Sequence, residues 1–212
     1  MDKSKIRCKN IFSDERILSW MERVYQNSVE KGFHDHEYTF DHEMMLIITE
    51  LSEAVDAHRN LRVGSDSLAQ EMHTNFRAER KSDIEMYESK LKDTVHDELA
   101  DVFIRAMDLM AHEQLLLASD VRDPCNKEEK EPILEAIRIV GWENQMRGET
   151  FPAQIFEIIR QSALFFKHYD CLKLVMNMVC AIANLHDCPL DVYIELKMEY
   201  NRSRPRLHNK AY

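Results

Sequence analysis

Apolar residues recur every three or four positions along most of the chain, and this spacing is typical of amphipathic helices. The clearest stripe consists of Met44, Ile47, Ile48, Leu51 and Val55. Ser13 or Asp14 can cap an earlier helix, and Gly32 is well placed to end it. The pattern predicts helices at about 14–31, 41–62, 133–144, 153–168, 171–185 and 190–201, and a long helix through 97–118.

Two stretches interrupt this helical pattern. Residues 65–90 are the most polar part of the chain, and we expect a mobile or partly helical excursion there. Pro124 and Pro132 mark a linker, because proline disfavours helix at the residue before it. The whole chain, 1–212, is long enough for one domain with a sizeable core.

Composition supports a helical fold. The 212 residues include only 4 Gly and 5 Pro but 12 Met, so turn formers are scarce. Hydrophobic residues make up 44% and charged residues 31%, as in ordinary globular proteins. We therefore predict an all-α helical bundle.

The formal net charge of −10 disfavours general nucleic-acid binding. No apolar run approaches the roughly 18 residues of a membrane span, so no membrane association is expected. The five cysteines have no Cys-x-x-Cys spacing, which favours reduced thiols. These features predict a cytoplasmic protein.

Two acidic pairs are the main candidates for chemistry. Glu50 and Glu53 are three residues apart in one predicted helix, and Glu98 and Asp101 repeat the spacing in another. This spacing points two carboxylates to one helix face. Four clustered carboxylates would suit Mg²⁺, with Mn²⁺ as the other option. Either pair alone, however, is most often a solvated helix face.

The chain ends in a basic segment, because no acidic residue follows Glu199. This segment either is a solvated terminus or binds an anion opposite the acidic pairs. The loop at 30–36 holds Phe33 and His34, and it is either a ligand-contacting loop or a simple surface turn.

Together these residues resemble the all-α nucleotide pyrophosphohydrolases of the MazG-like and dimeric dUTPase type. That family carries an E-x-x-E motif on one helix and an E-x-x-D motif on a later one. The resemblance rests on Glu30-Lys31-Gly32-Phe33, Glu50-Leu51-Ser52-Glu53, Glu98-Leu99-Ala100-Asp101, and the segment from Lys197 to Pro205 with His208 and Lys210. It covers about 14–62, 93–112 and 187–210, and departs from the compact family pattern by insertions at about 65–90 and 118–186.

The resemblance implies Mg²⁺-dependent hydrolysis of a nucleoside triphosphate, such as dUTP or another dNTP, to the monophosphate and pyrophosphate. It also implies a homodimer or higher homo-oligomer, with extra helices inserted after the E-x-x-D helix. The expected metal ligands are Glu50, Glu53, Glu98 and Asp101, with Glu53 and Glu50 as the catalytic residues and Glu53 the favoured general base. The expected substrate-binding residues are Phe33 and His34 at the base, and Lys197, Asn201, Arg204, His208 and Lys210 toward phosphate or sugar.

Two other classes remain open. A di-iron helical bundle also uses inward carboxylates, but such sites want Glu-x-x-His on two helices, and neither acidic pair has it. A non-catalytic helical adaptor would leave the acidic pairs solvated and would gain no stability from metal and nucleotide.

Overall fold

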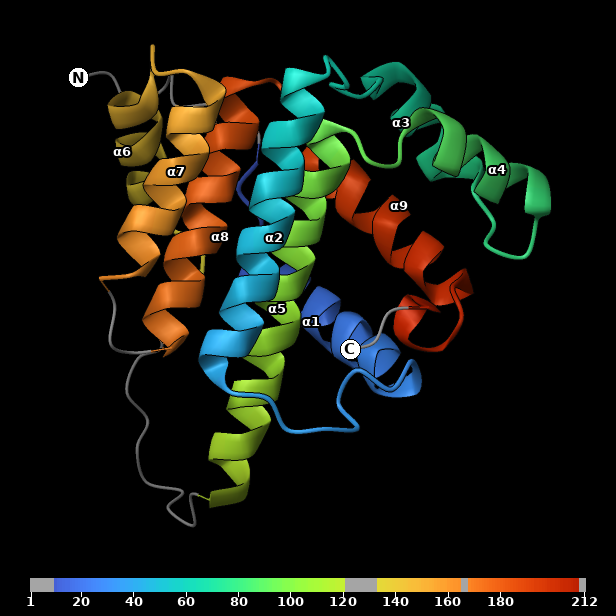
Figure 1. Cartoon of the computed structure of the whole chain (residues 1–212), viewed down its shortest axis with the longest axis horizontal. Helices are drawn as coiled ribbons and strands as arrows, with labels where there is room; N and C mark the ends of the chain where they lie inside the picture. Colours follow the sequence, from blue (N-terminus) through green and yellow to red (C-terminus); the bar gives the residue numbers. More distant parts are fainter. Residues whose placement is uncertain (1–9, 121–132, 165–167, 210–212) are drawn as a thin grey trace.

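The computed structural model describes residues 10–120, 133–164 and 168–209, and these residues form helices without any strand (Figure 1). The predicted all-α class is therefore confirmed for the described part of the chain. The helices are α1 (Asp14–Glu30), α2 (Phe40–Arg59), α3 (Asp66–Asn75), α4 (Lys81–Lys90), α5 (Val95–Asp120), α6 (Ala136–Met146), α7 (Phe151–Ser162), α8 (His168–Leu185), α9 (Leu190–Ser203) and the 3-10 helix η2 (Arg206–Asn209).

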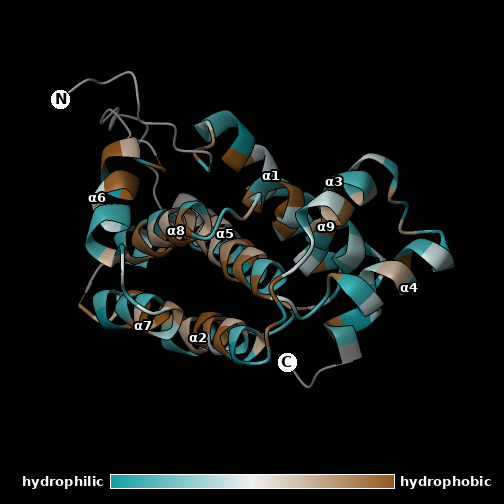
Figure 2. Cartoon of the chain, turned by 90° about the horizontal axis from the view of Figure 1, so that it is seen from above, coloured by the Kyte–Doolittle hydropathy of each residue, from teal (hydrophilic) through white to brown (hydrophobic). Residues whose placement is uncertain are grey.

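Four helices form a closed bundle. Helix α2 packs on α5, α5 on α8, α8 on α7, and α7 back on α2. Seen from above, α2 and α7 lie in one layer, and α5 and α8 lie in the other (Figure 2). Helix α6 covers α8 from outside. Helices α7 and α8 thus cover the face of α2 and α5 that points away from the acidic pairs.

Helix α8 is the most deeply enclosed element, because every residue from Cys171 to Ala183 is buried. A helix that is apolar on all sides can be stable only with neighbours all round it. Its buried Asn177 is satisfied locally, since its side-chain amide donates to Ile133 O at 2.9 Å and to Lys173 O at 2.7 Å. The helical pattern of this segment is thus explained by core packing.

Helices α1 and α9 pack against α5 and against each other. As predicted, Ser13 caps α1 by accepting a hydrogen bond from Arg16 N. Trp20 is buried and donates through Nε1 to Glu195 Oε1 of α9 at 2.6 Å, while Arg23 pairs with the same carboxylate at 2.8 Å. These contacts fix the distance between α1 and α9, which form one wall of the cavity described below.

The excursion expected at 65–90 is more regular than the sequence pattern indicated. It consists of the two short helices α3 and α4, and α3 packs against α9. Met72 and Phe76 are buried, and Tyr87 is completely enclosed. These few large apolar side chains anchor an otherwise polar segment, so tertiary packing supplies the order that local composition does not.

Two helices end several residues earlier than the sequence pattern predicted. Helix α2 ends at Arg59, because Leu61 takes a positive φ of 57° and Arg62 N donates to Ala57 O at 2.9 Å. The helix predicted to reach residue 168 ends at Ser162, and α8 begins at His168. The expected linker prolines, Pro124 and Pro132, lie outside the described residues.

No single helix in the described ranges is both long and apolar enough to cross a membrane; α8 and α9 reach that length and composition only as a pair bent by 116°. The described cysteines, Cys171, Cys180 and Cys188, are buried. Burial raises the pKa of the Cys171 thiol to about 11, which keeps this thiol protonated at neutral pH.

Candidate functional site

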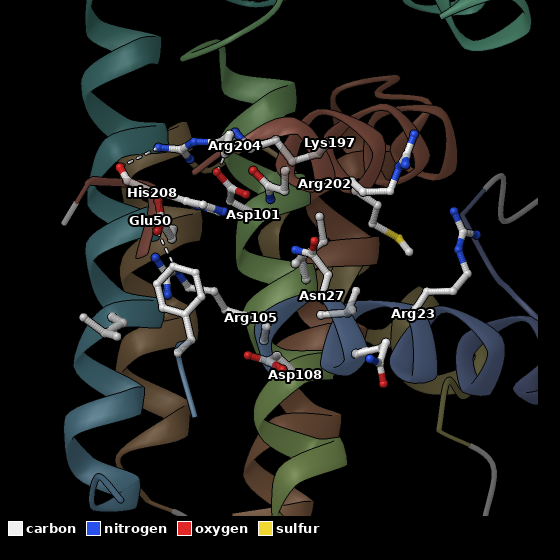
Figure 3. A pocket seen from close by; sticks show the side chains of 18 of the residues that line it. Arg23, Asn27, Glu50, Asp101, Arg105, Asp108, Lys197, Arg202, Arg204 and His208 are labelled. Carbon is white, nitrogen blue, oxygen red and sulfur yellow. Dashed lines mark hydrogen bonds and ion pairs between the residues drawn. The ribbon is translucent and has the colours of Figure 1, made fainter. Parts of the chain in front are cut away.

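A cavity of about 720 Å³ lies between the α2–α5 pair and the wall formed by α1 and α9 (Figure 3). It brings together nearly all the site residues expected from the sequence: Phe33, His34, Glu50, Glu53, Glu98, Asp101, Lys197, Asn201, Arg204 and His208 all line it. Lys210 lies outside the described residues. Their roles stay predictions, but residues up to 175 positions apart in sequence share one cavity.

Three carboxylates meet at one end of the cavity. Single oxygens of Glu50, Glu98 and Asp101 lie within 4.8 Å of one another. Glu50 and Glu98 are 4% and 2% exposed, whereas Asp101 is half-buried. We call these three residues, together with Lys197, the carboxylate end. Glu53 lies outside this group, on the exposed side of α2, although it still lines the cavity.

Burial disfavours the charged forms of the carboxylates at this end of the cavity. Burial, followed by the charge of Asp101, raises the pKa of Glu98 to about 9. Burial and the charge of Asp101 also raise the pKa of Glu50, although Arg105 opposes this rise. Glu98 Oε2 is buried and has no hydrogen-bond partner among the described residues. Such an oxygen is unfavourable unless a proton or a cation satisfies it.

Two cations of the protein flank the carboxylates. Arg105 Nε donates to Glu50 Oε1 at 2.5 Å. Lys197 Nζ lies 2.6 Å from an oxygen of Asp101 and 2.6 Å from an oxygen of Asp97. Lys197 is 3% exposed, and the charges of these two aspartates outweigh the opposing effect of burial and raise its pKa. Both cations therefore stay charged at neutral pH.

Asp97 is itself completely buried and accepts two hydrogen bonds besides its contact with Lys197. Tyr87 of α4 donates its hydroxyl to Asp97, and Asp93 N donates to the second oxygen at 3.0 Å. Burial raises the Asp97 pKa, while Lys197 acts in the opposite direction. Helix α4 is thus tied to the α5–α9 contact through a hydrogen bond to a buried carboxylate.

The opposite end of the cavity also carries acids, but their partner is a histidine. His34 Nε2 lies 3.1 Å from Asp108 Oδ1, and Glu43 lines the cavity nearby. We call His34, Glu43 and Asp108 the histidine end. Burial opposes protonation of His34, but the hydrogen bond and charge of Asp108, with the charge of Glu43, raise its pKa overall. Burial and the charge of Asp108 raise the pKa of Glu43.

The C-terminal segment closes the cavity against the loop after α1. Leu207 N donates to Lys31 O at 2.9 Å, and Arg206 pairs with Asp35. Gly32 has a φ of +82°, a left-handed backbone conformation that favours glycine over residues with a Cβ. Phe33 packs edge-on against His208 with ring centres 5.0 Å apart. The loop is therefore part of the cavity wall rather than a simple surface turn.

Several site residues were absent from the sequence prediction. Arg105 follows Asp101 by four residues, so helical spacing alone could have placed it on the same face. Asp97 directly precedes the E-x-x-D motif, but nothing in the surrounding sequence indicates that it pairs with Lys197. Asn27 of α1 also lines the cavity, and its Oδ1 is buried without a hydrogen-bond partner among the described residues. Nothing in the spacing of α1 identifies it.

Comparisons with protein-family models, with curated proteins and with solved structures gave no match to this chain. The geometry of the cavity therefore carries the functional argument.

Proposed function

We propose that this protein is a Mg²⁺-dependent nucleoside triphosphate pyrophosphohydrolase, which releases pyrophosphate and a nucleoside monophosphate. The observation that carries the proposal is the carboxylate end itself: three converging acids, one with an unsatisfied buried oxygen, open into a cavity that Arg202 and Arg204 also line. The resemblance of the two acidic motifs and the C-terminal segment to the MazG-like and dimeric dUTPase family supports the same activity.

The donor set is suited to a hard divalent cation. Glu50, Glu98 and Asp101 offer carboxylate oxygens only, and Mg²⁺ and Mn²⁺ prefer such ligands. The group contains no histidine, which gives no support to a di-iron site of the usual helical-bundle kind. A bound Mg²⁺ would supply charge neutralisation on phosphate oxygens and lower the pKa of a water molecule.

The remaining residues of the cavity would bind and orient the substrate. Arg204 lines the cavity near the carboxylate end and would donate to phosphate oxygens. Asn201 is 9% exposed, and its buried Oδ1 has no hydrogen-bond partner among the described residues. The unsatisfied oxygens of Asn201 and Asn27 would accept hydrogen bonds from sugar hydroxyls or base amino groups.

Glu53 would act as the general base. It lies one helical turn from Glu50, is exposed toward the cavity, and belongs to no close carboxylate group among the described residues. A carboxylate without a competing cation can accept a proton from an attacking water. The histidine end would accommodate the nucleobase of the substrate, with Phe33 and His34 beside it.

The test is pyrophosphate release from a panel of NTPs and dNTPs, with Mg²⁺ and with EDTA. We expect release only with the metal, and a loss of at least about 100-fold in kcat for Glu53→Gln. Glu71→Gln, on the exposed surface of α3, is the matched control and should leave kcat unchanged. Equal release by Glu53→Gln and wild type would remove Glu53 from the catalytic role, and no release from any nucleotide would favour the non-catalytic adaptor.

A further inference from the structure

Lys197 occupies an unusual position for a phosphate-binding lysine. Its ammonium group is buried and already contacts two carboxylates at 2.6 Å. One of these carboxylates, Asp101, belongs to the group of three that converges at the carboxylate end. A cation of the protein is therefore bonded to one of the residues that would hold the metal.

The two contacts of Lys197 are not equivalent. Asp97 is completely buried and is fixed by Tyr87 and by the backbone N–H of Asp93. Asp101 is half-buried and faces the cavity, where Glu50 and Glu98 converge with it. Lys197 thus has a permanent partner on the protein side and an exchangeable partner on the cavity side.

We propose that Lys197 is the counter-ion of the metal-free site, and that a divalent cation displaces it from Asp101 while Asp97 retains it. The proposal rests on the proposed function, because it assumes that the carboxylate end takes a metal. An ammonium group and a divalent cation repel each other strongly at one partly buried carboxylate, so they compete for Asp101. Once displaced, the ammonium group is available to a phosphate without leaving Asp97.

The competition has a direct thermodynamic consequence. Removing the Lys197 charge should tighten metal binding, although the same change would weaken binding of a triphosphate. Loss of the positive charge alone also favours a cation at this site, whatever role Lys197 has. A lysine that does not compete for Asp101 therefore predicts no gain in metal affinity only when the lost charge is balanced, as in the double variant described below.

The experiment measures Mn²⁺ binding to the full chain without nucleotide, by titration calorimetry or by the electron paramagnetic resonance of free Mn²⁺. For Lys197→Met we expect the Kd to fall by about tenfold or more. Lys173→Met is the matched control, since Lys173 is 7% exposed, pairs with Glu135 at 3.8 Å, and does not line the cavity. Its Kd should remain within about twofold of wild type.

A second variant keeps the test decisive if Lys197→Met fails to fold because Asp97 and Asp101 lose their cation. The double variant Asp97→Asn/Lys197→Met removes one charge of each sign, so the local net charge is unchanged. Its Kd should still be about fivefold below wild type, because Asp101 is released from its bonded cation.

The outcomes separate this proposal from the proposed function. Mn²⁺ binding by wild type with no gain in either Lys197 variant overturns the competition and leaves the pyrophosphohydrolase proposal standing. Absence of Mn²⁺ binding in every protein overturns both. Tighter binding in the Lys197 variants, without pyrophosphate release by wild type, supports the competition and rejects only the enzyme.

Discussion

The two ends of the cavity have similar acidic residues but different partners. Asp101 and Asp108 lie seven residues apart on α5, roughly 10 Å along the helix at 1.5 Å per residue. At the carboxylate end the partners are Lys197 and Arg105, whose charges persist at neutral pH. At the histidine end Asp108 pairs with His34, whose charge changes near neutral pH.

The difference shows how to distinguish an acidic residue with a structural role from one that would bind a cation. Asp108 has a partner at 3.1 Å, and nothing further is required to explain its position. Glu98 has a buried oxygen with no partner among the described residues, and its pKa is raised to about 9. Unsatisfied buried oxygens, more than acidic composition, mark the end of the cavity that would take a cation.

The largest expected effect comes from Glu98→Gln, which replaces the carboxyl group whose Oε2 has no partner among the described residues. Metal-dependent pyrophosphate release should fall by about 1000-fold, because a metal ligand is lost. The metal-free variant should nevertheless be more stable than wild type, by about 1–2 kcal/mol at alkaline pH.

The sign of the stability change follows from the raised pKa of Glu98. The folded protein binds this proton up to about pH 9, whereas the unfolded chain releases it near pH 4.5, so wild-type stability falls as pH rises between these values. Thermal unfolding in EDTA at pH 6 and pH 9 should therefore show a gain for Glu98→Gln that grows with pH. A variant less stable than wild type at pH 9 would contradict the cost assigned to Glu98.

Arg105→Ala tests whether the ion pair between Arg105 and Glu50 stabilises the fold. The guanidinium group pairs with Glu50 at 2.5 Å, and its removal leaves a buried carboxylate without its cation. Because the Arg105 side chain is 28% exposed, we expect a loss of about 2 kcal/mol, less than for a fully buried pair. Urea unfolding at neutral pH measures it. Arg105→Lys keeps the charge and should recover part of the lost stability. If the free energy of unfolding of Arg105→Ala stays within about 0.5 kcal/mol of wild type, the pair is not stabilising.

His34→Gln should have the smallest effect and a distinctive pH dependence. The folded-state pKa of His34 is raised, so its stabilising contribution is present below about pH 6.5 and is lost as pH rises through the folded value. The variant should lose less than about 1 kcal/mol at pH 5.5 and almost nothing at pH 8.5. His36→Gln, an exposed histidine of the same loop, is the control in thermal unfolding. An equal loss at both pH values would show that protonation of His34 does not matter.

The helical elements were largely predictable because they depend on local periodicity. The apolar stripe of α2, the Ser13 cap of α1 and the all-round apolar α8 each leave a signal within a few turns of sequence. The α3–α4 segment was not predicted in full, because its order depends on a few buried side chains such as Tyr87. Local composition there is polar, and only contacts with the rest of the fold stabilise the helices.

By itself, the sequence determined which residue types could form a site and the order in which they occur. The i, i+3 spacing put Glu98 and Asp101 on one face of α5, whatever their surroundings. Only the tertiary structure decided that Glu50 joins them while Glu53 remains at the exposed rim. It also decided that Lys197, 96 positions beyond Asp101, forms an ion pair with Asp101. The physical reason is that burial and ion pairing depend on distances between helices, which no local spacing specifies.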